Sequence, residues 1–463
     1  MKSPPRRGAP EASREPAVGA APRYHIETWG CQMNVHDSEK LASGLERDGY
    51  VRAEGVADAD VVLLNTCAIR EKAEEKVFSA LGRLRGWKDA VPGRVLGVCG
   101  CVAQQSGPAI FRRAPHVDLV VGPRAASSIP GAVRSARGSG APARFLDLEQ
   151  RTDSLSFPFD EIRREGLGSG KAFVTIIEGC NHRCTYCVVP RTRGAEICRP
   201  MTDVLAEVRS LAGSGIVEVE FLGQTVNAYR DAEGHPLGDL LRSAAEVPGI
   251  ARLRFTTSHP AQMTDRLMDA MRDARPTVCP YLHLPVQSGS STVLRTMRRG
   301  YDREGYLAKI DGLRRRIPVM SFGTDVIVGF PTETEADFQE TDRLLDEVGF
   351  DVVYSFAYSE RAGTRAVELG DTVETRVKFA RLARVQEHQI AIQERRNREW
   401  IGRTVPILIE GPSQRGDSQW TGRTAENRIV HFPGPDRAGR ILDVRVTDAT
   451  ALSLRGERIG SHA

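Results

Sequence analysis

"AFVTIIEGCNHRCTYCVVP", residues 172–190, joins an apolar run typical of a buried strand to three cysteines. Cys180, Cys184 and Cys187 fall within eight positions, which is too dense for three unrelated core thiols. The run opens a strand–helix rhythm that occurs six times between residues 166 and 375. Six such units predict a partial (βα)6 barrel rather than a closed eightfold one. Ligands gather at the carboxyl ends of barrel strands, so the cysteines stand where a site is expected.

Four explanations compete for these three cysteines. They are buried structural thiols, a disulfide with a spare thiol, a zinc site completed by His182, or an iron–sulfur cluster. Structural zinc favours paired two-residue spacings, which the run Cys-x3-Cys-x2-Cys lacks. Three thiolates on a four-iron cluster leave one iron open, and an open position is what catalysis needs. The spacing therefore favours a cluster.

A second set of thiols lies in the first segment, which alternates strand and helix patterns and predicts a parallel α/β sheet. Cys31, Cys67 and Cys101 each close one of its strands, 36 and 34 residues apart. Parallel strands end at one edge of a sheet, so the three thiols can converge there. The alternative is three separate buried cysteines. Cys99 follows Val98 directly and is expected within the strand, so Cys101 is the predicted third member.

The rest of the composition limits location and class. Hydrophobic residues make up 40% of the 463, charged residues 27%, and the net charge is +4, too weak to prove a nucleic-acid partner. No apolar run approaches the roughly 18 residues of a membrane span. The first residues lack a signal sequence, so we expect a cytoplasmic protein. In that compartment clustered thiols are more often metal-binding than disulfide-bonded. Five short strand patterns after residue 400 predict a small β-barrel of oligonucleotide-binding type.

Taken together the motifs resemble those of a known family. With the aromatic Tyr186 before its last cysteine, the first cluster resembles the signature of radical S-adenosylmethionine enzymes. The whole chain after residue 23 resembles the methylthiotransferases of that superfamily, through the stretches "TWGCQMN", "LLNTCAIREKA", "GCVAQ", "EGCNHRCTYCVVPRTRG", "FLGQTVNAY", "RFTTSHP", "HLPVQSGS", "DVIVGFPTET" and "GRTAENRIVHF".

The resemblance implies two [4Fe–4S] clusters, one on Cys180, Cys184 and Cys187 and one on Cys31, Cys67 and Cys101. The first would bind S-adenosylmethionine at its open iron, and the second would hold the sulfur. The implied domains are a disordered tail (1–22), a methylthiotransferase N-terminal domain (23–138), a linker (139–165), a radical S-adenosylmethionine domain (166–396) and a TRAM RNA-binding domain (399–460).

The implied activity is methylthiolation of C2 of N6-(dimethylallyl)adenosine in tRNA, next to the anticodon. It implies an electron donor such as a flavodoxin or ferredoxin, a sulfur donor, no membrane contact and a monomer. Two alternatives stay open within the family, namely threonylcarbamoyladenosine of tRNA and an aspartate of a ribosomal protein. An alternative of another class is a non-catalytic RNA-binding protein with structural zinc.

Polar residues at the ends of barrel strands are candidate contacts for S-adenosylmethionine, and the alternative for each is a turn cap. These candidates are Tyr186, Gln224, Ser258, Gln287 and Asp325. Three positions depart from the family pattern. Thr225 replaces an Asn and puts a ligand contact in doubt, Cys198 replaces a more usual Ser, and Cys99 is an additional thiol.

Overall fold

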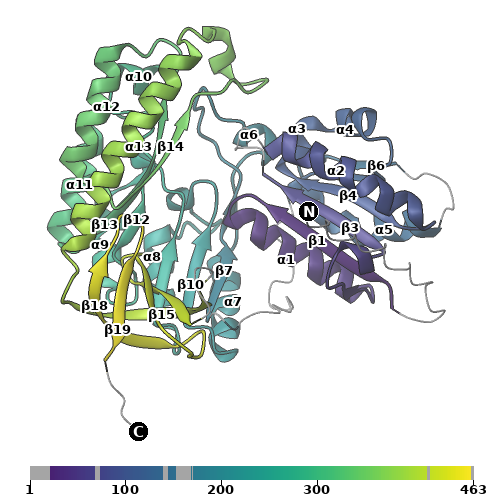
Figure 1. The fold of residues 1–463 in the computed structure, drawn as a ribbon, viewed down its shortest axis with the longest axis horizontal. Helices are drawn as coiled ribbons and strands as arrows, with labels where there is room; N and C mark the ends of the chain where they lie inside the picture. The colour runs from purple at the N-terminus through teal and green to yellow at the C-terminus, as the bar shows by residue number, and fades with distance from the viewer. Residues whose placement is uncertain are drawn as a thin grey trace, which may run out of the picture.

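The computed structural model describes residues 21–67, 73–138, 144–152, 168, 170–413 and 418–459. Nearly all of the predicted tail at 1–22 lies outside these residues. Figure 1 shows an α/β unit on the right, an open barrel on the left and a small yellow β-barrel beneath the open barrel. In the described chain, no helix combines the length and apolar character that crossing a membrane requires.

The N-terminal unit is one six-stranded parallel sheet in the order β2-β1-β3-β4-β5-β6, with helices on both faces. Its strands are β1 (Arg23–Trp29), β2 (Val51–Arg52), β3 (Val61–Thr66), β4 (Val95–Gly100), β5 (Leu119–Val121) and β6 (Phe145–Asp147). Its helices are α1 (Gln32–Arg47), α2 (Ala73–Ala90), α3 (Cys101–Ser106), α4 (Pro108–Arg113) and α5 (Ile129–Gly138). The predicted parallel sheet is confirmed, and β3 and β4 are buried throughout because both faces are covered.

One predicted boundary is wrong. The segment 139–165 was expected to be a linker, but its residues 145–147 form β6 at the sheet edge, pairing with β5. A three-residue, half-exposed strand has no hydrophobic pattern long enough to detect, so only the sheet beside it reveals it. The other predicted boundaries stay predictions.

The middle unit confirms the partial (βα)6 barrel. Two three-stranded parallel sheets, β11-β10-β7 and β12-β13-β14, stand side by side. Ser258 N donates to His283 O (3.3 Å) between them. The strands are β7 (Lys171–Thr175), β10 (Glu218–Leu222), β11 (Arg252–Phe255), β12 (Tyr281–His283), β13 (Ser321–Val328) and β14 (Val352–Ala357). The helices are α6 (Val189–Thr192), α7 (Met201–Gly213), α8 (Leu237–Ala245), α9 (Asp265–Asp273), α10 (Ser291–Thr296), α11 (Arg303–Arg316), α12 (Glu335–Val348) and α13 (Thr375–Arg398). A two-stranded ribbon, β8 (Ile177–Glu178) with β9 (Ile197–Cys198), flanks the first cysteine.

Apolar and charged residues alternate along these strands, so each strand has an apolar face and a charged face. Val174, Phe221 and Phe255 are buried in the main apolar core, to which the barrel helices also contribute. Alternate residues carry charge instead, and Arg254 donates to Glu218 at 3.0 Å while Lys171 pairs with Glu220 at 2.5 Å. The barrel interior on this side is therefore polar and paired.

The C-terminal unit is the predicted five-stranded closed barrel, in the order β15-β16-β17-β19-β18. Its strands are β15 (Thr404–Pro412), β16 (Gln419–Thr424), β17 (Ile429–Pro433), β18 (Ile441–Ala449) and β19 (Leu454–Arg458). A small apolar core of Ile407, Val430, Phe432 and Val444 fills it.

Buried arginines attach this small barrel to the amino ends of the large barrel's strands by hydrogen bonds. Arg254 donates to the carbonyls of Thr424 (2.7 Å) and Ala425 (2.8 Å), while Arg252 donates to those of Arg423 and Pro406. Since a buried, unpaired cation is costly, these guanidinium groups need the small barrel to be in place.

We expect Arg254→Met to destabilise the chain by about 3–5 kcal/mol, because it leaves the buried Glu218 carboxylate and two carbonyls without a donor. Urea unfolding followed by tryptophan fluorescence measures this, since Trp400 and Trp420 pack on the small barrel. The control is Arg266→Met, where the exposed pair with Asp239 contributes at most about 1 kcal/mol. Equal midpoints for the two variants would contradict the anchoring role.

Candidate functional site

The three cysteines that open the barrel, here called the barrel triad (Cys180, Cys184, Cys187), lie on the loop between β8 and the single-turn helix α6. Cys187 N donates to Cys184 O (3.2 Å), and Cys180 N donates to Gly194 O (3.1 Å), which closes the loop at both ends. Gly179 precedes the triad with φ +86°, and a Cβ there would meet Ala195 O at 2.1 Å. Only glycine fits at this entry to the loop.

Two side chains contact the sulfur atoms of the barrel triad. Thr225 Oγ1 lies 3.2 Å from Cys180 Sγ, and Arg299 Nη1 donates to Cys184 Sγ at 3.3 Å. Thr225, the departure from the family pattern, is therefore a direct neighbour of a triad thiol. Arg299 is buried, and its Nη2 also donates to Pro285 O (2.9 Å). Hydrogen bonds and charge at a cluster sulfur tune the cluster's potential, so both residues belong to the site.

The N-terminal triad (Cys31, Cys67, Cys101) forms at the carboxyl edge of three neighbouring strands. Cys31 follows β1 and caps α1, Cys67 follows β3, and Cys101 begins α3 directly after β4. Cys67 N donates to Trp29 O (3.0 Å), which aligns the ends of β1 and β3. The predicted convergence of distant thiols at one sheet edge agrees with this placement.

Charge and hydrogen bonds link the three thiols. A hydrogen bond with Cys67, aided by the charge of Arg193, lowers the pKa of Cys31 to about 6. Burial raises the pKa of Cys101, while a hydrogen bond and the charge of Arg193 oppose that rise and the charge of Cys31 adds to it. Arg193 comes from the barrel loop just after α6, so the barrel contributes a cation to the N-terminal triad.

Cys99 is separated from this site. It stays in the ladder of β4, paired with Asn65 and Val121, and packs in an apolar cluster with Leu63 and Leu119. Burial alone raises its pKa to about 12. Gly100, at φ +86°, turns the chain so that Cys101 leaves the strand. This placement favours Cys101 over Cys99 as the third member of the N-terminal triad.

The spacing of the thiols argues against the zinc alternative. A tetrahedral zinc with bonds of about 2.3 Å holds its thiolates at roughly 4 Å from one another. Within the described ranges, the one group of three or more metal-ligand side chains whose donor atoms all lie within 4.8 Å is Asp231, Glu233 and His235, and neither triad qualifies. A four-iron cluster holds its thiolates on different irons and therefore further apart. Neither triad is therefore preformed to hold a single tetrahedral zinc ion.

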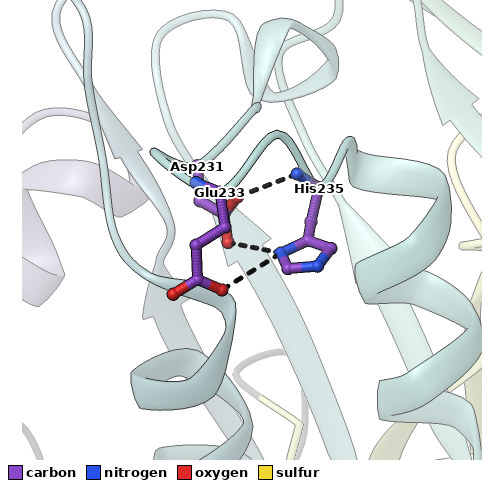
Figure 2. A group of neighbouring side chains, drawn as sticks. All are labelled: Asp231, Glu233 and His235. Atoms are coloured by element: carbon purple, nitrogen blue, oxygen red, sulfur yellow. Dashed lines mark hydrogen bonds and ion pairs between the residues drawn. The ribbon is translucent and has the colours of Figure 1, made fainter.

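The Asp231 group is a structured turn (Figure 2). Asp231 accepts from the backbone nitrogens of Met201 (3.1 Å) and His235 (2.8 Å), and from His235 Nδ1 (3.0 Å). These bonds start α7 and close the loop before α8. The Asp231 carboxylate therefore has a structural role in this turn.

The protonation of the barrel thiols fits metal binding as well. Burial raises the pKa of Cys187 to about 12 and raises that of Cys180, so both are neutral thiols near pH 7. A metal ligand must be a thiolate, so a metal bound here would displace these protons and its charge would compensate the buried thiolates.

A mostly apolar cavity of about 470 Å³ lies beside Cys187. Three of the five predicted cofactor contacts line it, namely Tyr186, Gln287 and Asp325, together with Phe356 and Phe379 from β14 and α13. Asp325 Oδ1 lies 3.2 Å from His283 Nε2. The cavity is large enough for a nucleoside-sized ligand and carries few polar groups to orient it.

The other two predicted contacts lie apart from this cavity. Gln224 Oε1 accepts from Gly179 N (2.5 Å), so its carbonyl holds the triad loop. Ser258 is 3% exposed, and its hydroxyl has no hydrogen-bond partner among the described residues. Next to it His259 stacks on His182 at 3.8 Å, within the barrel triad's loop. Burial lowers the pKa of His259 to about 2, so this ring is neutral.

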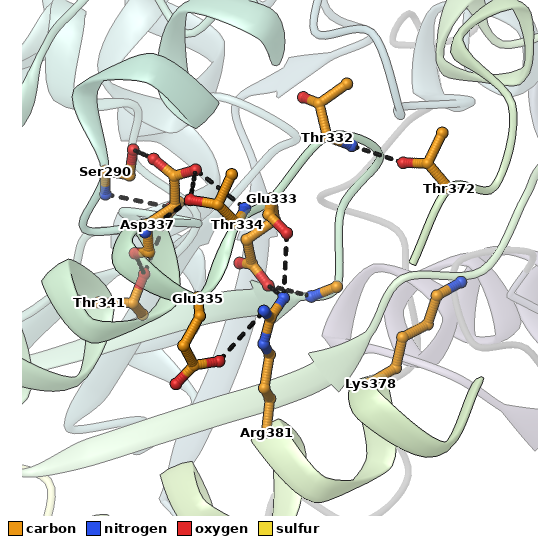
Figure 3. A network of polar contacts seen from close by, with 12 residues as sticks. Ser290, Thr332, Glu333, Thr334, Glu335, Asp337, Thr341, Thr372, Lys378 and Arg381 are labelled. Carbon is orange, nitrogen blue, oxygen red and sulfur yellow. Dashed lines mark hydrogen bonds and ion pairs between the residues drawn. The ribbon is translucent and has the colours of Figure 1, made fainter. Parts of the chain in front are cut away.

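A polar network holds the loop that follows β13, the strand that carries Asp325 (Figure 3). Glu333 accepts from Gly329 N (2.6 Å) and from Arg381 Nη1 of α13 (2.7 Å). Burial raises the pKa of Glu333 to about 7 despite Arg381. Thr334 caps α12 through Asp337 N, and Asp337 also accepts from Ser290 (2.6 Å). These bonds hold the loop after β13 beside the cavity that Asp325 lines.

Sequence patterns missed the arginines of this site. Arg299 sits in a basic stretch that also suits an exposed helix face, and Arg193 follows the triad without a charged partner nearby in sequence. Part of the basic pattern on α13 is likewise internal, since Lys378 and Arg381 are buried. Arg193, six residues after Cys187, could have been found as a basic residue beside the predicted cluster loop, whereas no sequence signal indicated Arg299, which lies 115 residues from Cys184.

Comparison with known families covers all three units. Family models match the uncharacterized protein family UPF0004 at residues 23–122, the radical SAM superfamily at 174–345 and the TRAM domain at 398–459.

Curated relatives span almost the whole chain. A tRNA-2-methylthio-N(6)-dimethylallyladenosine synthase of Halorhodospira halophila is 47% identical over 96% of this chain and 94% of its own length. Proteins with the same name from Xanthomonas euvesicatoria and Alkalilimnicola ehrlichii are each 46% identical, over 94% and 95% of this chain and 91% and 98% of their own.

Among solved structures, the radical S-adenosylmethionine methyltransferase TsrM from Kitasatospora setae has a TM-score of 0.53 at 14% identity, covering 73% of each chain. The cobalamin-dependent radical enzyme OxsB has a TM-score of 0.52 at 11% identity, covering 80% of this chain and 57% of its own. These two likenesses concern the fold.

On the expectation that each triad holds one cluster, Cys101→Ser should lose about half of the bound iron, because the N-terminal triad then loses a ligand. Cys99→Ser is the matched control two residues away and should keep nearly all of it, since its sulfur packs in the apolar core. Iron assay after anaerobic reconstitution measures both. The reverse pattern would overturn the assignment, and equal loss would mean that the two thiols share the site.

Proposed function

The chain belongs to the family of tRNA-2-methylthio-N(6)-dimethylallyladenosine synthases, and from this we propose that it adds a methylthio group to C2 of N6-(dimethylallyl)adenosine in tRNA, next to the anticodon. Membership of the radical SAM superfamily carries an iron–sulfur cluster and S-adenosylmethionine with it. The two paralogous substrates are not favoured, because the relatives that match over the full length carry the dimethylallyladenosine name.

One observation carries the proposal. The N-terminal triad gathers at the carboxyl edge of β1, β3 and β4, and the barrel triad lies on the loop that follows β8. The helix α6 leads from that loop to Arg193, which donates to Asp37 of the N-terminal unit. Methylthiolation of an aromatic carbon requires one site that generates a radical and a second that holds sulfur, and we assign the barrel triad to the first role and the N-terminal triad to the second.

The residues divide the work in this proposal. The barrel triad would hold a [4Fe–4S] cluster with one open iron, and the N-terminal triad a second cluster. When bound, the first cluster and S-adenosylmethionine supply the radical that activates an aromatic C–H bond. Tyr186, Gln287 and Asp325 would line the cofactor's nucleoside cavity, and Ser258 would offer its unpaired hydroxyl to the ligand. Gln224 and Thr225 hold the triad loop.

The RNA would be held by the small barrel and neighbouring helices. Arg437, Arg440 and Arg445 are exposed on the small barrel, and Arg376 and Arg384 on α13. Contacts of arginine with phosphates weaken steeply with salt. The proposal includes an electron donor such as a flavodoxin or ferredoxin, a sulfur donor, a cytoplasmic location and action as a monomer, all by analogy with the family.

Nucleoside mass spectrometry tests the function. In tRNA from a strain that lacks the gene, the methylthio form of dimethylallyladenosine should vanish and its unmodified precursor should accumulate. The gene in trans should restore it, and a copy with Cys184→Ala should not. Unchanged nucleosides in the deletion strain would refute the proposal, and loss of a threonylcarbamoyladenosine derivative instead would favour the paralogous activity.

We expect Cys67→Ala to separate the two halves of the chemistry. The barrel triad is untouched, so 5′-deoxyadenosine should still form from S-adenosylmethionine, whereas the methylthio product should disappear. Chromatography of both products from one reaction gives the ratio. Cys279→Ala is a control, since that thiol is buried away from both triads. Persisting methylthio product in Cys67→Ala would exclude the N-terminal triad as the sulfur site.

A further inference from the structure

Two phenylalanine side chains are exposed at the cavity beside Cys187. Phe356 on β14 is 42% exposed and Phe379 on α13 is 57% exposed, and both line that cavity. Neither side chain belongs to an apolar core of the described residues. Exposed aromatic side chains that gather at a cavity indicate a surface that a ligand covers.

Two aliphatic side chains extend this surface. Ile327 of β13 pairs in register with Phe356, so the two side chains stand on the same face of the sheet. Leu382 follows Phe379 by three residues on α13, which places the two on one face of the helix. All four residues line the cavity, and they are here called the apolar rim (Ile327, Phe356, Phe379, Leu382).

The apolar rim lies along an open edge of the barrel. β14 is the last strand of its three-stranded sheet, and α13 packs against it (Figure 1). A ligand can therefore reach the rim without displacing a strand. Arg376, one turn before Phe379, is exposed, and its surface pair with Glu374 is of a kind that contributes little. That arginine is available to a phosphate of a nucleic acid.

Other elements give the same cavity its reactive and polar lining. Cys187 comes from the triad loop, Gln287 follows β12, and Asp325 lies on β13. Gln287 N donates to Asp325 O (2.8 Å), which fixes these two residues relative to each other. The cavity of about 470 Å³ thus joins a barrel thiol to an apolar surface at the barrel's edge.

The proposed substrate has the same two-part chemistry. Its reacting atom is C2 of adenine, and its five-carbon dimethylallyl group is attached to N6. N1 separates C2 from C6 in the ring, so the group on N6 leaves the base in a different direction from C2. A base whose C2 points toward the barrel triad therefore needs apolar surface elsewhere in the cavity. Each carbon buried there raises affinity by about fourfold.

We propose that the apolar rim receives the dimethylallyl group of the reacting adenosine, with Phe356 and Phe379 as the residues that select prenylated over unmodified tRNA. This rests on the proposed function, since it takes the substrate from it. Unmodified adenosine leaves the rim exposed to water. A threonylcarbamoyl group places a carboxylate against apolar side chains, which is costly.

The test measures binding of two synthetic anticodon stem-loops to the full chain with S-adenosylmethionine present. The stem-loops are identical except that the target base carries N6-dimethylallyladenosine in one and adenosine in the other. The variants are Phe356→Ala, Phe379→Ala, the double variant and Phe379→Leu. Because both phenylalanines are exposed, their truncation leaves the apolar cores intact. The matched control is Ile390→Ala, which removes a 50% exposed side chain from the same helix outside the cavity.

The wild type should bind the prenylated stem-loop about tenfold more tightly than the unmodified one, since a few apolar carbons are worth at least this much. Phe356→Ala and Phe379→Ala should each reduce this preference to about threefold, and the double variant should abolish it. Phe379→Leu keeps an apolar side chain and should retain most of the preference. Ile390→Ala should match the wild type.

Three results would overturn the proposal. The first is a wild-type chain that binds both stem-loops equally, and the second is a full preference in the double variant. The third is a loss of S-adenosylmethionine affinity in Phe379→Ala with the preference retained, which would assign the rim to the cofactor. Failure of the proposed function is separate, because it would show as binding with the expected preference but no methylthio product from the prenylated stem-loop.

Discussion

In the main sheets of both α/β units each strand runs parallel to its neighbour, so consecutive strands deliver their carboxyl ends to a common edge. The gathering of the candidate site residues depends on this parallel arrangement of the strands. Cys31, Cys67 and Cys101 are far apart in the chain yet share one edge, and the residues that come after the barrel strands share another. The small barrel attaches at the opposite ends of the barrel strands, where it leaves the triads clear.

The contact between the N-terminal unit and the barrel, here called the seam, is polar, in contrast to the apolar cores on either side. Asp37, Glu178, Arg124 and Arg193 are buried there and joined by hydrogen bonds, and beside them the Thr175 hydroxyl donates to Met33 Sδ at 3.9 Å. A buried ion network stabilises little in net terms, but it tolerates few alternative geometries. Its value here is orientation, because a site divided between two units works only if the units keep one angle.

Much of this arrangement could be predicted from the sequence, and the reasons are local. Six strands of the barrel and five of the small barrel have clear patterns, and Cys101 could be preferred over Cys99 because the strand ends between them. The strands β5 and β6 were not predicted, because a strand of three residues shows no hydrophobic periodicity. The roles of Arg193, Arg299 and Thr225 could not be predicted for another reason. Their partners Asp37, Cys184 and Cys180 lie 156, 115 and 45 residues away in the chain, and one sequence holds no record of such pairs.

The helix α6 spans only Val189–Thr192, a single turn between the last barrel thiol and Arg193. A turn this short acts as a fixed spacer. Each inserted residue would rotate the downstream chain by about 100° and advance it by about 1.5 Å. One added residue would swing the guanidinium out of the seam rather than merely lengthen the path. The stretch from Cys187 to Arg193 should therefore tolerate changes of side chain at its exposed positions but no change of length, so that deletion and insertion scanning would find here a segment as intolerant as the cysteines themselves.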